Sequence, residues 1–144
     1  MGINWIQWSY WESVPESAVI GGTDVDGATL YVGRVSHKGD QIPAKVIPAN
    51  RVAYFPYKGK ELTSYYCWVL LGNNVSWVPS SFGVVPSNAV IGGTTEAGEL
   101  LYIGRALHNG RLTPGVIKPS HMTLYIPFND KAISYKNYEV LVEN

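Results

Sequence analysis

Short runs of β-branched and aromatic residues fill most of the chain, and glycines and prolines separate them. Two such runs, 30–35 and 101–106, are followed by Lys38-Gly39 and Asn109-Gly110, and the Asn-Gly pair is a strong hairpin signal. Further strands are predicted at 51–55, 65–71, 123–126 and 137–142, and those at 51–55 and 123–126 are each expected to end at the following proline. No window of about 11 residues has helical periodicity, so the pattern predicts an all-β fold.

The chain repeats itself after 71 residues, the offset between Val14-Pro15 and Val85-Pro86. Between 14–70 and 85–141, 22 of 57 aligned positions are identical without a gap. The identities include both Gly-Gly pairs, at 21–22 and 92–93, which we expect to mark bulges or close backbone packing.

Two copies of this length favour one pseudo-two-fold domain over an elongated array of shorter repeats. We take residues 1–144 as that domain, with repeat one at about 5–72 and repeat two at about 73–144. The junction, 71–74, is a short turn and lacks the composition of a flexible linker.

The composition predicts a folded chain that does not bind a highly charged partner such as nucleic acid. Of the 144 residues, 46% are apolar and 15% are charged, with 11 basic residues against 11 acidic ones. This balance disfavours nucleic acid, and no apolar stretch is long enough to span a bilayer. Cys67, the single cysteine, excludes an intrachain disulfide. The first residues do not resemble a secretory signal, so we expect a cytoplasmic or vesicle-associated protein, with non-conventional secretion as an alternative.

Catalytic chemistry is poorly supported by the residue pattern. His37 and His108 occupy equivalent turns, and His121 has no evident partner. Cys67 lies in an apolar run that favours a buried thiol. Residues 24–27 lack the downstream glutamate of a calcium loop and are interpreted as a turn. We therefore expect no enzyme activity, no cofactor and no metal site.

Aromatic residues, at 12% of the chain, are the more suggestive feature. Most must belong to the core, but Trp5, Trp8 and Trp11 crowd a polar N-terminal segment, so some of them should remain partly exposed. Exposed rings beside hydrogen-bonding side chains are typical of sugar or peptide platforms.

A family resemblance rests on motifs that both copies carry. They are Val-Pro-x-x-Ala-Val-Ile-Gly-Gly-Thr, Leu-Tyr-x-Gly-Arg, a glycine turn followed by proline, and an ending that repeat two keeps as Tyr138-Glu139-Val140-Leu141. In these the sequence resembles the DM-nine repeat family over nearly its whole length. The resemblance implies a compact all-β domain whose two repeats exchange strands about a pseudo-two-fold axis. It also implies a lectin that binds mannose or mannose-rich glycans, with roles in immune recognition and agglutination.

The resemblance further implies which residues hold the sugar. They are an aspartate just after the Gly-Gly-x stretch and a lysine two residues after a proline, which correspond to Asp24 and Lys45. Repeat two departs at both positions, with Thr95 and Val116. Glu96 and Lys118 carry suitable charges but are displaced by one and two residues, so we expect one strong site per chain unless a homodimer completes another.

Three classes of function remain open. A mannose-type lectin leads. A non-catalytic protein-interaction module of vesicle trafficking or of the immune or parasite response, without a sugar ligand, comes second. A hydrolase is a distant third, for want of a nucleophile paired with a base.

Overall fold

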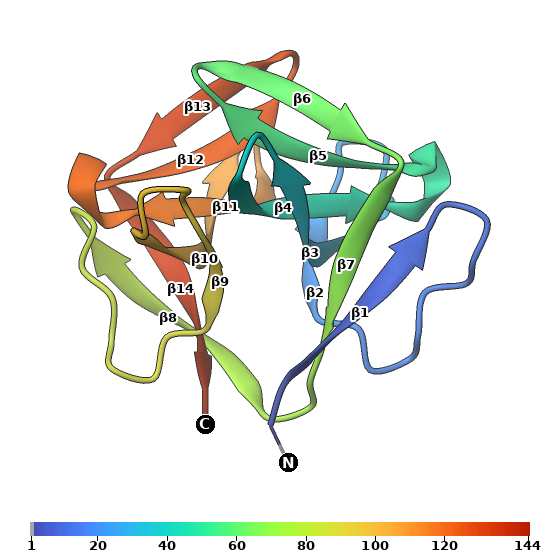
Figure 1. The fold of residues 1–144 in the computed structure, drawn as a ribbon, viewed down its shortest axis with the longest axis horizontal. Coiled ribbons are helices and arrows are strands. Elements are labelled where there is room, and N and C mark those ends of the chain that lie inside the picture. Colours follow the sequence, from blue (N-terminus) through green and yellow to red (C-terminus); the bar gives the residue numbers. More distant parts are fainter. Residues whose placement is uncertain (1) are drawn as a thin grey trace.

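The computed structural model describes residues 2–144 and contains a single sheet of fourteen strands (Figure 1). Repeat one contributes β1 (Asn4–Ser9), β2 (Ile20–Thr23), β3 (Thr29–His37), β4 (Asp40–Ile47), β5 (Val52–Tyr57), β6 (Lys60–Ser64) and β7 (Tyr66–Leu71). Repeat two contributes β8 (Val75–Ser81), β9 (Ile91–Thr94), β10 (Leu100–His108), β11 (Arg111–Lys118), β12 (Thr123–Phe128), β13 (Lys131–Tyr135) and β14 (Asn137–Glu143). The helical residues described are two short 3₁₀ turns, η1 (Pro48–Asn50) and η2 (Pro119–His121). The all-β prediction is confirmed.

The two glycine hairpins form as the sequence predicts. Lys38 and Gly39 connect β3 to β4 with φ of 49° and 87°, and Asn109 and Gly110 connect β10 to β11 with φ of 50° and 78°. Two successive positive φ angles define a turn whose twist matches that of the flanking strands. The predicted strands at 65–71 and 137–142 correspond to β7 and β14.

The prediction that prolines end two strands is wrong. β5 continues through Pro56, which lies opposite Glu61, and β12 continues through Pro127, which lies opposite Ala132. Pro56 lies beyond the last pair between β5 and β4, Lys45 with Tyr54, so its missing N–H removes no hydrogen bond from that ladder.

Strands of the two repeats interlock at the centre of the sheet. The order is β1-β7-β3-β4-β5-β6-β13-β12-β11-β10-β14-β8, in which β6 of repeat one meets β13 of repeat two. β9 of repeat two also pairs with β4 of repeat one, through Thr94 and Gln41. Figure 1 shows β4 and β11 side by side, with β6 and β13 crossing above them.

The backbones of the two repeats pack closely at the Gly-Gly pairs, which confirms the predicted close backbone packing. A Cβ atom on Gly22 would collide with the carbonyl oxygen of Leu112 in repeat two, and one on Gly93 would collide with that of Gln41 in repeat one. The register also shifts between Ile20 and Gly22, which marks a bulge.

The hydrophobic core is shared between the repeats. One cluster of buried residues combines three from each repeat: Val19, Val32, Leu70, Val90, Ile103 and Leu141. A second cluster, mainly from repeat one, includes Leu101 and Val116 of repeat two. Burial of both repeats in common clusters makes one compact domain. No helix among residues 2–144 is long and apolar enough to cross a membrane.

Candidate functional site

Asp24 begins the tight turn that joins β2 to β3. Its backbone N–H donates to the carbonyl of Ala28, its own carbonyl accepts from Gly27, and Asp26 Oδ1 accepts from the N–H of Ala28. Asp24 Oδ1 accepts from the N–H of Val25 at 2.9 Å. These bonds fix the turn and leave the half-buried Asp24 carboxylate beside the junction of the repeats.

Lys45 lies in β4 and is almost fully buried, with 4% of its surface exposed. Its Nζ lies 3.6 Å from Glu61 Oε2 in β6, and the two side chains are 5% and 10% exposed. The Tyr54 and Phe128 rings flank the ammonium, with Nζ 5.6 and 5.4 Å from their centroids. Tyr54 is the cross-strand partner of Lys45 in β5, whereas Phe128 comes from repeat two. Lys45 is therefore a buried, paired cation and not a solvated surface charge.

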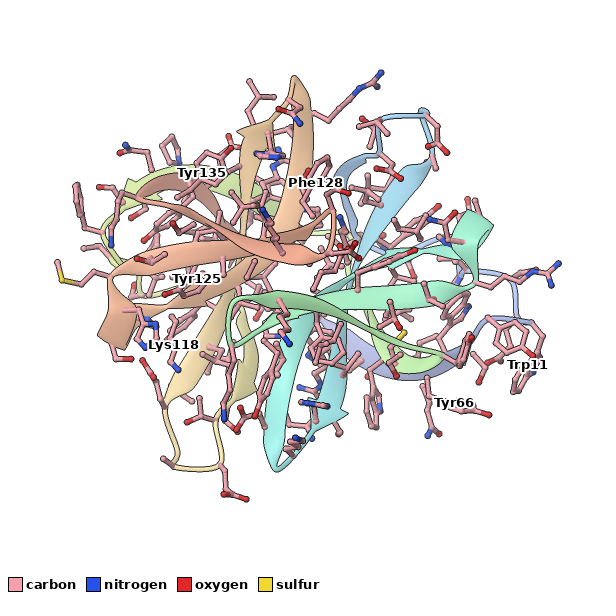
Figure 2. All side chains as sticks on the ribbon, turned by 90° about the horizontal axis from the view of Figure 1, so that it is seen from above. Trp11, Tyr66, Lys118, Tyr125, Phe128 and Tyr135 are labelled. Atoms are coloured by element: carbon pink, nitrogen blue, oxygen red, sulfur yellow. The ribbon has the colours of Figure 1, made fainter. Side chains whose placement is uncertain are left out.

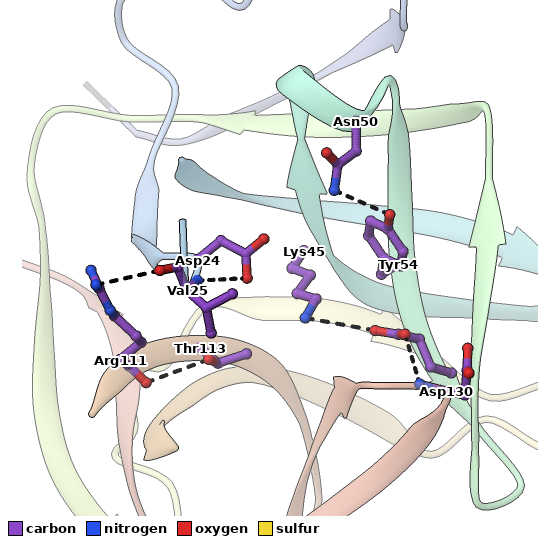
Figure 3. Close-up of polar contacts among 9 residues, drawn as sticks. Asp24, Val25, Lys45, Asn50, Tyr54, Arg111, Thr113 and Asp130 are labelled. Atoms are coloured by element: carbon purple, nitrogen blue, oxygen red, sulfur yellow. Dashed lines mark hydrogen bonds and ion pairs between the residues drawn. The ribbon is translucent and has the colours of Figure 1, made fainter. Parts of the chain in front are cut away.

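Asp24, Lys45 and Glu61 form one charged cluster, in which Lys45 is paired with Glu61; Figure 3 labels Asp24 and Lys45. Burial lowers the pKa of Lys45 from its ordinary value, and the negative charges of Glu61 and Asp24 oppose that shift. Figure 3 shows the Asp24 carboxylate on the same side of the repeat junction as the Lys45 side chain, so the structure places the two predicted site residues near each other. The repeats meet here as well, because the backbone N–H of Asp130 donates to Glu61 Oε1 and Arg111 Nη2 donates to the carbonyl of Val25.

The sequence interpretation missed Glu61, Tyr54 and Phe128. The sequence contains one signal for Glu61: the 71-residue alignment matches it with Ala132, just as it matches Lys45 with Val116. With Asp24, which Thr95 replaces, the two carboxylates and the ammonium form a set of three charged residues that repeat two lacks. Phe128 could not be inferred, because it reaches the site across the repeat junction.

In repeat two the equivalent position is a pocket of about 370 Å³, and both Thr95 and Val116 line it. Lys118 lines it too, since it stands two residues from Val116 on the same face of β11. Glu96 lies in the turn after β9, where its backbone N–H donates to Asp40 Oδ1 at 2.8 Å. A Cβ atom on Gly39 would contact the Glu96 carboxylate, so this carboxylate lies over the β3–β4 turn.

His37, His121 and Cys67 are each held by packing, a hydrogen bond or burial within the fold. The His37 ring packs against Phe55 and Tyr57 at the end of β3. The absence of a partner for His121 is a wrong prediction, because its Nδ1 lies 2.8 Å from the hydroxyl of Tyr125. Cys67 is 1% exposed, and burial raises its pKa to about 12, so its thiol stays protonated near neutral pH.

An exposed aromatic cluster lies at the outer end of repeat one. Trp11, Tyr65 and Tyr66 are each more than 60% exposed, and Tyr10 is 38% exposed. Their rings contact one another, with centroids 4.9 to 6.1 Å apart. Figure 2 shows Trp11 and Tyr66 at the periphery of the molecule. Partial exposure of the N-terminal tryptophans is thus confirmed for Trp11, whereas Trp8 is 2% exposed and belongs to the core.

The fold defines a class of protein: an all-β domain of two interlocked repeats, with a charged cluster in repeat one and an uncharged pocket floor at the corresponding position of repeat two. The DM9 repeat family model matches residues 2–64 and 24–135, and the chain belongs to that family.

Two further proteins resemble the chain. Natterin-3 of Thalassophryne nattereri is 29% identical over 146 residues, which cover 96% of this chain and 37% of Natterin-3. The crystal structure of the nematode sperm cell motility protein MFP2B shares the fold, with a TM-score of 0.69 at 9% identity, over 99% of this chain and 47% of that one. The chain therefore spans less than half the length of either protein.

Proposed function

We propose that this protein is a lectin that binds mannose or mannose-rich glycans at the site of Asp24, Lys45 and Glu61. The observation that carries the proposal is the charged cluster at the repeat junction, with two aromatic rings around it and the half-buried Asp24 carboxylate at its edge. Membership of the DM9 repeat family supports a binding role.

The chemistry of the cluster suits neighbouring sugar hydroxyls. Among residues 2–144, Asp24 Oδ2 has no hydrogen-bond partner and can accept from a hydroxyl. The ammonium of Lys45 carries three N–H donors, and its 3.6 Å separation from Glu61 exceeds the roughly 2.8 Å of a strong charge-assisted bond. A hydroxyl oxygen that reaches the ammonium can therefore accept from it, while the Tyr54 and Phe128 rings that flank the ammonium hold it in place.

Agglutination and immune recognition are part of the proposal and need more than one site per particle. With one site per chain, a homodimer or a larger protein that carries this domain would supply the second site. The cytoplasmic or vesicle-associated localisation stays a prediction from the sequence.

Calorimetry with methyl α-mannoside, preceded by a glycan array to choose the best ligand, tests the proposal. Asp24→Asn keeps an acceptor for the Val25 N–H but removes the charge, and we expect it to weaken binding by at least about tenfold. Asp26→Asn, which changes the same residue type in the same turn, should bind as wild type does. Unchanged affinity in Asp24→Asn would place the sugar elsewhere, and a wild-type protein that binds no glycan would overturn the lectin proposal.

The exposed aromatic cluster favours a second candidate, a protein-interaction module without a sugar ligand. Contiguous exposed apolar surface is typical of interaction sites. In that case Trp11→Ala together with Tyr66→Ala should abolish a partner interaction that Asp24→Asn leaves intact, which a pull-down with both variants measures.

A further inference from the structure

The pocket of repeat two is the pseudo-two-fold counterpart of the Lys45 site, but its chemistry differs. Val116 occupies the position of Lys45, Ala132 that of Glu61 and Thr95 that of Asp24, and all three line the pocket. The substitutions remove the buried ion pair and replace two long side chains by short ones. A cavity of about 370 Å³ with a neutral, apolar floor results.

Two aromatic rings border this cavity. Tyr125, the cross-strand partner of Val116, corresponds to Tyr54, and Tyr57 corresponds to Phe128. In repeat one these two positions hold the rings that flank the Lys45 ammonium. In repeat two they flank the space above Val116, where Lys58 Nζ lies 5.4 Å from the Tyr57 ring centroid and no cation among residues 2–144 lies over the Tyr125 ring. A flat apolar ring can occupy this space and stack on the tyrosines.

The rim of the pocket carries two ammonium groups, those of Lys58 and Lys118, and one carboxylate, that of Asp40. Lys58 and Lys118 both line it, and neither forms an ion pair within residues 2–144. Figure 2 shows Lys118 close to the strand that carries Tyr125. The acidic groups nearby are already bonded, since Asp40 Oδ1 accepts from the backbone of Glu96 at 2.8 Å and the Glu99 carboxylate accepts from the N–H and hydroxyl of Ser120, both at 2.8 Å. These carboxylates keep their charge: burial raises the pKa of Glu99, but the hydrogen bonds from Ser120 and the charges of Lys118 and His121 lower it on balance, so Lys118 already faces one carboxylate. Lys58 and Lys118 are the ammonium groups of the pocket lining that can donate to an anionic ligand.

We propose that the repeat-two pocket binds a small aromatic molecule with a single carboxylate, whose ring lies between Tyr57 and Tyr125 and whose anionic group meets Lys118 and Lys58. The pocket volume falls within the range of about 300–1,000 Å³ that is usual for small-molecule sites. The proposal does not depend on sugar binding at Asp24.

Three indoles of similar shape test the ligand class: indole-3-acetate is an anion, 3-methylindole is neutral and tryptamine is a cation. In a ¹⁵N–¹H NMR titration of the full chain, indole-3-acetate should bind most tightly and tryptamine most weakly. The largest shifts should fall on the amides of Leu101, Val116 and Ala132. Equal affinity for the three indoles, or shifts elsewhere on the chain, would overturn the proposal.

Two variants locate the site. Lys118→Glu should lower the affinity for indole-3-acetate by about fivefold and change the affinity for 3-methylindole by no more than about twofold. Arg51→Glu makes the same charge reversal at an exposed position outside the pocket and should change neither affinity. Val116→Lys with Ala132→Glu recreates the ion pair of repeat one and should abolish binding of all three. If that double variant fails to fold, the Lys118→Glu comparison still decides, because equal effects of Lys118→Glu and Arg51→Glu would contradict the assigned site.

Discussion

The Nζ of Lys45 lies 3.6 Å from Oε2 of Glu61, and both side chains are nearly buried where the two repeats meet. Removing two charges from water is costly unless they remain paired and hydrogen-bonded. Here each charge depends on the other, and the backbone N–H of Asp130 in repeat two donates to the same carboxylate. The ion pair thus links the candidate sugar site to the assembly of the repeats.

Loss of one member of this pair should destabilise the protein more than loss of both. Glu61→Gln leaves the Lys45 ammonium buried without a counter-charge, and we expect it to lower the free energy of unfolding by about 2–3 kcal/mol. Lys45→Met with Glu61→Leu removes both charges at similar volume and should cost less than Glu61→Gln alone. Urea denaturation compares wild type, Glu61→Gln and the double variant, and a double variant that is less stable than Glu61→Gln would contradict the pairing.

The contact between Gly22 and the carbonyl of Leu112 should tolerate no side chain. Gly22→Ala forces one backbone away from the other, and we expect a loss of more than about 2 kcal/mol in the free energy of unfolding. Gly2→Ala, where the added Cβ meets only the Glu143 side chain at an ordinary 3.5 Å, is the matched control and should change stability little. Similar urea midpoints for the two variants would argue against close packing of the repeats.

Neither repeat should fold by itself. A fragment of residues 1–73 would lose the shared core clusters and leave β4 and β6 without their partners β9 and β13. Exposed strand edges favour aggregation, so the fragment should be unfolded or aggregated. A monomeric fragment with a dispersed NMR spectrum would show that repeat one is an independent domain.

Cys67 should make the stability fall at alkaline pH. Its thiol has an ordinary pKa of 9.0, which burial raises to about 12 in the folded protein. Between these values the unfolded chain has lost a proton that the folded chain retains, so folding becomes less favourable as the pH rises. Cys67→Ala lacks this effect, and the difference in unfolding free energy between wild type and variant should shrink from about pH 7.5 to about pH 10. A constant difference would contradict the assigned burial.

The fold was largely predictable because its signals are local. The Asn109-Gly110 turn needs two positive φ angles, which these residues adopt readily, and the 71-residue repeat transfers each element of one copy to the other. The prediction that β5 ends at Pro56 was wrong because a proline interrupts a strand where its backbone N–H is needed for a hydrogen bond to the neighbouring strand, and the pairing of β4 with β5 does not extend as far as Pro56. That information lies in the extent of the neighbouring strand β4 and not in the sequence around the proline.

The candidate site was predictable only within one repeat. Asp24 and Lys45 follow recognisable motifs, and Glu61 could have been found from its replacement by Ala132. Phe128 and Asp130 approach through the packing of β12 and β13 on repeat one, a long-range contact that no local pattern encodes. The burial of Lys45 has the same origin, since the ring of Phe128 helps to cover it.

We propose that Asp24, Lys45 and Glu61 together make a sugar site that repeat two lacks. Grafting the three residues into repeat two, as Thr95→Asp, Val116→Lys and Ala132→Glu, tests it most directly. Titration with methyl α-mannoside should give about one sugar per wild-type chain and about two per grafted chain, with NMR spectra that show both proteins folded. Two equal sites in the wild-type chain, or no second site in a folded grafted chain, would contradict the assignment of the sugar site to these three residues.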